Sequence, residues 1–169
     1  MKQFEGKGNY AINKYYKFPY RFFYRKKLKM IVNLLPKGKV FYNILDFGSG
    51  PGIFTDQLKQ HSIHVNQFES NDVLDPRWHY DAIVCASVLE FCSLNLTISI
   101  LYNILNPGGK LFVASPMNTA LASLYFKSIG DKQGRNSHKS IISAVSKRFR
   151  IEKYDTWMNL YFALRASRS

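Results

Sequence analysis

The sequence has few of the features that would indicate a secreted, membrane-spanning, disulfide-bonded or zinc-binding protein. No run of 18 apolar residues is present, and the first ten residues, MKQFEGKGNY, lack the apolar stretch of a secretory signal. Cysteine occurs only at Cys85 and Cys92, without His or Cys neighbours at ligand spacing, so we predict two buried thiols and no metal site. We expect a cytoplasmic protein.

Acidic side chains are also scarce, with 11 Asp and Glu against 24 Lys and Arg. The imbalance is uneven: residues 1–43 carry a net charge of +10, residues 44–130 carry −3, and residues 131–169 carry +6. One interpretation is a mildly acidic binding core with a positive surface for an anionic partner, and the other is a solubilising surface. The composition leaves both open.

Strand and helix signals alternate along the chain, whose 169 residues suit a single domain over residues 1–169. Apolar runs predict strands at 42–47, 63–68, 80–85 and 110–115, and two more strands fit at 148–155 and 159–166. Helices are predicted after Pro51 and over 93–105 and 137–147, the second of them stopped by Asn-Pro-Gly-Gly at 106–109. This order predicts an α/β fold with a mostly parallel sheet covered by helices on both faces.

The turn after the first strand is unusually rich in glycine and lacks two common nucleotide-binding patterns. Residues 48–52 read GSGPG, and Ile53 stands where a dinucleotide fingerprint has its third glycine. No Lys follows, which excludes a P-loop. Such a turn lets a ligand approach the backbone closely, and Asp46 just before it favours a cationic ligand over a diphosphate.

The segment from Asp46 to Gly52, DFGSGPG, resembles motif I of the class I S-adenosylmethionine-dependent methyltransferases. YDAIVCASVLEF at 80–91 is similar to the family's fourth strand, and LYNILNPGGKLFVASP at 101–116 to its next helix, turn and fifth strand. The resemblance covers residues 20–169 and is closest to the small-molecule, type 11/12-like branch. That branch commonly has His where this chain has Phe91.

The resemblance implies a Rossmann-like methyltransferase fold, S-adenosyl-L-methionine as cofactor and ten cofactor-binding residues. Gly48 and Gly50 would line the methionine moiety, and Asp46 would lie near its ammonium group. Glu69, 17 residues after Gly52, would accept the ribose hydroxyls, and Asp72 would meet the adenine edge. The complete set is Asp46, Phe47, Gly48, Ser49, Gly50, Glu69, Ser70, Asp72, Ala86 and Ser87.

The chain departs from the family after the second strand. Only 35 residues separate Asp46 from Asp81, where the common fold fits a strand, a helix, another strand and a loop. We therefore predict that one helix and one strand are missing or abbreviated. This shortening leaves open a degenerate module that binds the cofactor or RNA without catalysis.

The N-terminal segment, residues 1–40, is predicted to be basic, aromatic and helical over 20–35. Tyr20, Tyr24, Leu28, Ile31 and Leu35 form one stripe, with Arg21, Arg25, Lys26 and Lys29 opposite. Upstream aromatics at Tyr10, Tyr15, Tyr16 and Phe18 extend it. The segment suits a helix that caps the sheet, a membrane-surface anchor or an RNA-binding surface. In the last two cases the anionic partner is the membrane or the RNA. The protein would then be peripheral at a membrane surface or bound to RNA.

Function is predicted as methyl transfer by in-line displacement to a small-molecule, sugar or lipid-linked acceptor. The catalytic residue is unknown. If the acceptor is a hydroxyl that needs a base, His138 is the best single candidate. The alternative interpretation is that His138 is only an exposed residue at the start of a helix. The sequence contains neither Asn-Pro-Pro-Tyr nor Pro-Cys, which mark methylation of bases at exocyclic amines and at cytosine C5. An RNA methyltransferase and the non-catalytic module remain alternatives.

Overall fold

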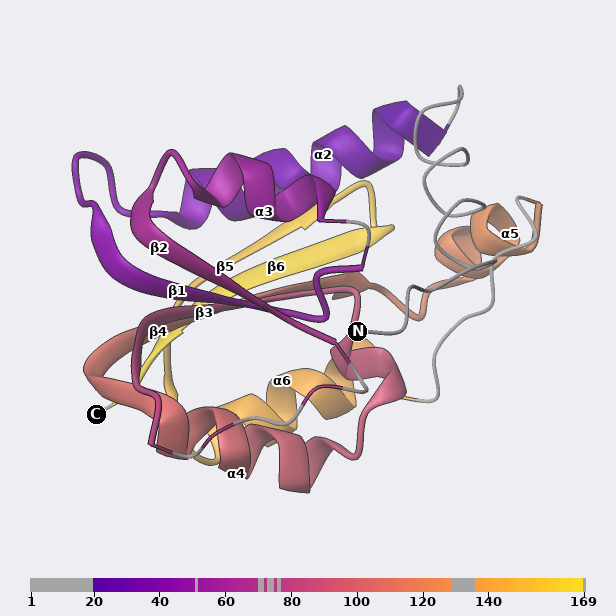
Figure 1. Cartoon of the computed structure of the whole chain (residues 1–169). Helices are drawn as coiled ribbons and strands as arrows, with labels where there is room; N and C mark the ends of the chain where they lie inside the picture. The colour runs from indigo at the N-terminus through magenta and orange to yellow at the C-terminus, as the bar shows by residue number, and fades with distance from the viewer. Residues whose placement is uncertain are drawn as a thin grey trace.

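The structure, a computed structural model, describes residues 20–50, 52–69, 72, 75, 77–128 and 136–168, arranged around one six-stranded sheet (Figure 1). The strands are β1 (Phe41–Phe47), β2 (Ser62–Phe68), β3 (Tyr80–Ala86), β4 (Leu105–Pro116), β5 (Arg150–Trp157) and β6 (Tyr161–Ser167). They lie in the order β2-β1-β3-β4-β6-β5. β1 to β4 are parallel, and β6 runs antiparallel to β4 and β5. The predicted mostly parallel α/β sheet is confirmed.

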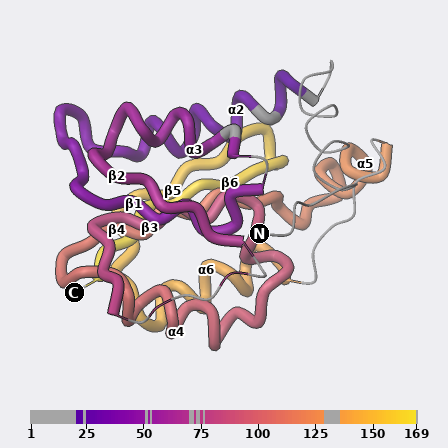
Figure 2. The backbone as a smooth tube through the Cα atoms, viewed as in Figure 1, coloured from indigo at the N-terminus to yellow at the C-terminus, as the bar shows by residue number. Residues whose placement is uncertain are grey.

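Helices cover both faces of this sheet, as the backbone tube also shows (Figure 2). The described helices are α2 (Tyr20–Leu34), α3 (Ile53–Leu58), α4 (Leu94–Ile104), α5 (Ala120–Ser128) and α6 (His138–Ser146), with a 3-10 turn, η1 (Leu89–Phe91). Successive strand residues point to opposite faces. Ile44 and Val84 therefore pack toward α2 and α3, whereas Leu45 and Ile83 pack toward α4 and α6.

Two elements differ from the sequence prediction. β4 begins at Leu105, directly after α4, because Leu105 pairs with Tyr80 before a register shift, so the Asn-Pro-Gly-Gly segment lies inside the strand. α5 was not predicted. Its buried side chains, Ala122 and Phe126, pack on the second core cluster, and this tertiary contact accounts for a helix that lacks a clear apolar period.

The segment between β2 and β3 is where the shortening was predicted. β2 lies at one end of the sheet order. The described residues of this segment, 69, 72, 75 and 77–79, contain no helix and no strand. The intervening positions lie outside the described residues, so the abbreviation stays a prediction.

The N-terminal helix packs on the C-terminal hairpin through a shared ion network. Glu152 on β5 accepts from Lys110 on β4 at 2.6 Å and from Arg165 on β6 at 2.9 Å. Arg165 also donates through Nη1 to the main-chain oxygen of Leu34 at 3.1 Å. The end of α2 is thereby fixed to the last strand.

The predicted stripe of the N-terminal helix was too narrow. Leu28, Ile31 and Leu35 are buried as expected, but Lys27, Met30 and Leu34 are buried too. Nothing is described of the side chains of Tyr20 and Tyr24, and Tyr10, Tyr15, Tyr16 and Phe18 lie outside the described residues. No helix among the described residues is long and apolar enough to cross a membrane.

Candidate functional site

The carboxyl ends of β1, β3 and β4 meet at one edge of the sheet, where the predicted site residues gather. In an open parallel sheet this edge is where ligands bind. The loop after β1 contains the glycine turn, and the loop after β3 leads into η1. β2 ends beside β1, since Phe47 pairs with Phe68.

The glycine turn uses backbone conformations that other residues rarely adopt, and it opens to free space at one position. Gly48 has a φ of +76°, and a Cβ there would lie 2.5 Å from a methyl carbon of Val88. Gly50 has a φ of +54°, and a Cβ there would meet no atom within 4 Å. Gly48 therefore permits close packing against the loop after β3, whereas Gly50 leaves a bare backbone facing an open volume.

Asp46 is a buried carboxylate with one unsatisfied oxygen. It is only 1% exposed, and its Oδ2 accepts from the Thr55 hydroxyl on α3 at 2.6 Å. Its Oδ1 has no hydrogen-bond partner among the described residues. Burial raises the pKa of Asp46 to about 6, the hydrogen bond from Thr55 opposes the rise, and the nearby Glu69 adds to it. Such an oxygen suits a cationic donor supplied by a ligand.

Glu69 reaches from the end of β2 onto the glycine turn. Its Oε1 accepts from the Ser49 hydroxyl at 3.0 Å and from the main-chain N–H of Gly50. Asp72 in turn accepts the main-chain N–H of Glu69 at 2.7 Å and donates its own N–H back to the Glu69 carbonyl at 2.9 Å. Ser49, Gly50, Glu69 and Asp72 are thus linked at one corner of the sheet, close enough to Asp46 for the charge of Glu69 to act on it.

Ser87 follows β3 with a left-handed backbone, φ +56°, which is uncommon for a residue other than glycine. Its main-chain N–H donates to the carbonyl of Ala114 on β4 at 2.8 Å. Its hydroxyl accepts from the Lys27 ammonium of α2 at 2.8 Å. Lys27 is only 6% exposed, so α2 places a buried cation at the site edge.

Glu90 is a second buried carboxylate, 4% exposed, in η1. Its Oε2 accepts from the Ser115 hydroxyl on β4 at 2.6 Å. Burial raises the pKa of Glu90, and the hydrogen bond from Ser115 and the charge of Lys27 oppose that rise. The half-buried Ser87 is also hydrogen-bonded to the Glu90 side chain. A polar chain of Lys27, Ser87, Glu90 and Ser115 therefore runs from α2 to β4 beside the glycine turn.

The sequence analysis missed both Lys27 and Glu90, although a signal for each was present. Lys27 lies four residues after Phe23 and four before Ile31, which is the spacing of one helical face. Glu90 is part of the SVLEF segment that carried the family resemblance. The basic run around Lys27 concealed its position, because lysine is usually exposed.

The remaining predicted residues lie at the same edge with different roles. The Phe47 ring is buried and stacks on Phe68 at 5.0 Å, so only its backbone faces the turn. Ala86 ends β3 and packs against the core cluster beneath α2. Ser70 lies outside the described residues. The cofactor roles of these residues stay predictions.

His138, the candidate base, starts α6 and is bonded to the loop after β4. The ring Nδ1 of His138 accepts the main-chain N–H of Asn118 at 3.0 Å, and the main-chain N–H of His138 donates to Asn118 Oδ1 at 2.8 Å. An accepting Nδ1 places the proton of the neutral ring on Nε2. Burial, and then the charge of Lys139, lowers the pKa of His138. His138 thus links α6 to the loop after β4, and a catalytic role for it stays a prediction.

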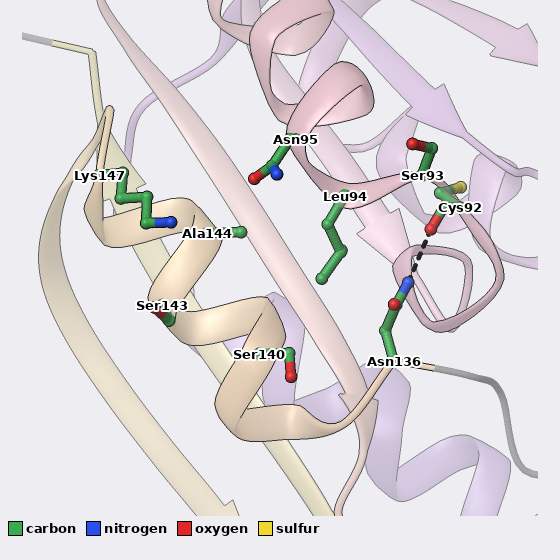
Figure 3. A pocket seen from close by; sticks show the side chains of 9 residues that line it. All are labelled: Cys92, Ser93, Leu94, Asn95, Asn136, Ser140, Ser143, Ala144 and Lys147. Carbon is green, nitrogen blue, oxygen red and sulfur yellow. Dashed lines mark hydrogen bonds between the residues drawn. The ribbon is translucent and has the colours of Figure 1, made fainter.

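A separate groove of about 500 Å³ lies between the start of α4 and α6 (Figure 3). At its end Asn136 donates to the carbonyls of Leu89 at 2.8 Å and Cys92 at 2.7 Å, which fixes the turn that contains Glu90. The groove is lined by Cys92, Ser93, Leu94, Asn95, Asn136, Ser140, Ser143, Ala144 and Lys147. Over the described part of the chain, no group of His, Cys, Asp and Glu side chains could hold a metal ion.

Comparison with known proteins gives one family and many similar folds. Residues 20–155 match a family model described as a methyltransferase domain. The fold is similar to that of the N-methyltransferase NodS from Bradyrhizobium japonicum WM9 in complex with S-adenosyl-L-homocysteine, with a TM-score of 0.69 and 16% identity, covering 95% of this chain and 97% of that one.

Two further solved structures have similar folds. An S-adenosylmethionine-dependent methyltransferase from Mesorhizobium loti has a TM-score of 0.64 and 12% identity, covering 82% of this chain and 95% of that one. Human N-acetylserotonin methyltransferase has a TM-score of 0.62 and 16% identity, covering 85% of this chain and 52% of that one. The search of curated proteins gave no match.

Proposed function

Because this chain belongs to the methyltransferase-domain family, we propose that it transfers the methyl group of S-adenosyl-L-methionine to a small-molecule acceptor, with sugar and lipid-linked molecules included in that class. One observation carries the proposal: Asp46 has an unsatisfied buried oxygen, and it lies two residues before a glycine turn that opens to free space at Gly50. A cationic cofactor fits that arrangement, since a second carboxylate, Glu69, lies beside the first.

Each residue of this corner has a definite task in binding. Asp46 Oδ1 would accept a hydrogen bond from the ammonium of the methionine moiety, which otherwise has no buried counter-charge. The bare backbone at Gly48 and Gly50 would line that moiety. Glu69 would keep its Oε1 on the glycine turn and offer its other oxygen to the ribose hydroxyls.

The cofactor supplies a methyl group bonded to a positively charged sulfur, which leaves with the bonding electron pair as the acceptor atom bonds to carbon. The protein therefore has to align the acceptor and exclude water. α2 covers the edge of the sheet and contributes Lys27, while η1 and β4 hold the other side through Glu90 and Ser115. The acceptor proton leaves to solvent, or to His138 if the acceptor is a hydroxyl.

Cofactor affinity is expected to rise with pH up to about 6 and then level off. The pKa of Asp46 is about 6 in the free protein, and a bound ammonium lowers it, so binding releases a proton below that pH. Titration calorimetry with S-adenosylhomocysteine between pH 5 and 7.5 measures this, with a slope approaching about tenfold per pH unit. Asp46→Asn should bind weakly and lose the slope over this range. A slope that persists in Asp46→Asn would contradict the role of Asp46.

Glu69→Ala is expected to weaken cofactor binding by about 1–3 kcal/mol, because a charged hydrogen bond to the ribose is lost. Glu69→Gln should recover part of this loss, since an amide oxygen still accepts. Methionine itself lacks a ribose and would bind both variants as it binds the unchanged protein, provided that the turn keeps its shape. An effect of equal size on methionine would assign Glu69 to the support of the turn.

The experiment that tests the proposal is titration of the purified, nucleic-acid-free protein with S-adenosylmethionine and S-adenosylhomocysteine at low and high salt. Saturable binding of both at either salt supports the proposal and justifies an acceptor screen by transfer of a labelled methyl group. Salt-sensitive binding of RNA without binding of either cofactor would favour the non-catalytic module instead. Methyl transfer to RNA alone would favour the RNA methyltransferase.

A further inference from the structure

Four exposed apolar side chains, Phe22, Leu121, Leu124 and Met158, form a patch that borders the site edge, the rim patch. Phe22 on α2 is 50% exposed, Leu121 and Leu124 on α5 are 50% and 68% exposed, and Met158 in the turn between β5 and β6 is 61% exposed. Leu121 and Leu124 are three residues apart and so share one face of α5. Large apolar side chains that gather at one place on a surface usually mark an interaction site.

Three segments distant in sequence are held together beneath the rim patch. The Phe23 ring lies 4.3 Å from the Tyr125 ring, which joins α2 to α5. Phe22 and Trp157 have ring centroids 5.9 Å apart, which joins α2 to the end of β5. Thr119 donates through its hydroxyl to the carbonyl of Asn159 at 2.6 Å, which joins the start of α5 to the turn.

Cations accompany the rim patch on α2, and acidic side chains are missing from α2 and α5, whereas the exposed Asp155 lies three residues before Met158. Arg25, Lys26 and Lys29 follow Phe22 by three, four and seven residues, so they lie on its face of α2. Lys26 also lies over the Trp157 ring at 5.7 Å. The sequence has no Asp or Glu between residues 6 and 45 or between residues 91 and 130, which include α2 and α5.

The rim patch lies at the same edge of the sheet as the candidate site. Tyr161 pairs with Pro116 at the carboxyl end of β4, so the turn before β6 stands at that end. α5 follows β4 directly, and α2 reaches Ser87 at the end of β3 through Lys27. A partner bound to the rim patch would therefore face the opening of the site.

We propose that the rim patch docks on a membrane surface that contains anionic phospholipids. Leu121, Leu124 and Met158 are aliphatic side chains that can enter the acyl boundary, whereas stacking on RNA bases requires aromatic rings. Arg25 and Lys29 extend from the helix toward the anionic headgroups, with their alkyl chains along the apolar surface. Docking in this way does not depend on methyl transfer. It favours a lipid-linked acceptor, and only that last step rests on the proposed function.

The test is co-sedimentation of the protein, without cofactor, with phosphatidylglycerol–phosphatidylcholine vesicles and with pure phosphatidylcholine vesicles. We expect binding to the anionic vesicles that weakens as salt rises. The double variant Phe22→Ser/Leu124→Ser should reduce partitioning at least about tenfold, because two apolar side chains no longer enter the lipid. Arg25→Gln/Lys29→Gln should reduce binding to anionic vesicles by roughly fivefold per cation.

The matched control is Leu96→Ser/Ile100→Ser, which changes two exposed apolar residues of α4 on the other face of the sheet. This control variant should bind vesicles as the unchanged protein does. Circular dichroism checks that all of the variants fold. Equal loss in the α4 control, or no binding to anionic vesicles, overturns the proposal. Salt-sensitive retention of RNA without vesicle binding would assign the surface to nucleic acid.

Discussion

Replacing Gly50 with valine is expected to abolish binding of S-adenosylmethionine, with a loss of at least about 100-fold, or more than about 2.7 kcal/mol. The Cβ direction at Gly50 points into the open volume that we assign to the cofactor, so the valine methyl groups would occupy it. Titration calorimetry with S-adenosylhomocysteine measures the affinity. Gly50→Ala should give a smaller loss, because one methyl group fills less of the volume.

Gly38 provides the matched control for the backbone cost of this substitution. It has a φ of +71°, and a Cβ there would also meet no atom within 4 Å, but it lies in the turn between α2 and β1, away from the site edge. A left-handed conformation costs a residue with a side chain roughly 1–2 kcal/mol at either position. Gly38→Val should therefore lose stability and keep the cofactor. Unchanged affinity in a folded Gly50→Val protein would refute the site.

Replacing Lys27 with methionine is expected to lower the free energy of unfolding by about 3 kcal/mol, because it leaves the buried Glu90 carboxylate without its compensating charge. For a chain of this size the melting temperature should fall by about 6–12 °C. Lys29→Met removes the same charge from the exposed face of α2 and should change stability by less than about 0.5 kcal/mol. Urea denaturation followed by circular dichroism measures both variants.

A double-mutant cycle separates the pair from the packing of the lysine stem. Lys27→Met/Glu90→Gln removes both charges, so it should be more stable than Lys27→Met alone by about 1–2 kcal/mol. Additive effects of the two single substitutions would show that Lys27 and Glu90 do not stabilise one another.

Because Lys27 also donates to Ser87 at the site edge, a folded Lys27→Met protein should bind its acceptor less well. Methyl-transfer assays at one cofactor concentration can compare the acceptor KM of this variant with that of the unchanged protein.

The parts of the site that the sequence predicted are those that depend on neighbouring residues. Asp46 and the glycine turn follow an apolar strand directly, and Glu69 ends the next strand, so strand and turn patterns were enough to bring them together. Lys27 reaches Ser87 from 60 residues away. Its burial is decided by how α2 packs on the sheet, and no local pattern specifies that packing.

The same difference between local and long-range contacts explains which elements of the fold were predicted. The strands β1, β3, β4 and β6 were predicted near their observed positions because their apolar runs are strong and short. β2 and β5 are more polar and were also predicted near their observed positions. α5 has weak periodicity, and it is positioned by the contact of Phe126 with Tyr161, whose ring centroids are 5.7 Å apart. The early start of β4 depends on the pairing of Leu105 with Tyr80, which is likewise a property of the assembled sheet.

The placement of β6 between β4 and β5 has a consequence for the order of assembly. β6 is synthesised after every element that it contacts, and its Arg165 is bonded to Leu34 from a position 131 residues later. α2 therefore leaves the ribosome long before β6 and cannot complete its packing until β6 has inserted. Contacts of such long sequence separation slow folding, because a large loop must close before they form. Until β6 has inserted, the apolar face with which α2 packs on the sheet stays incompletely covered in the nascent chain.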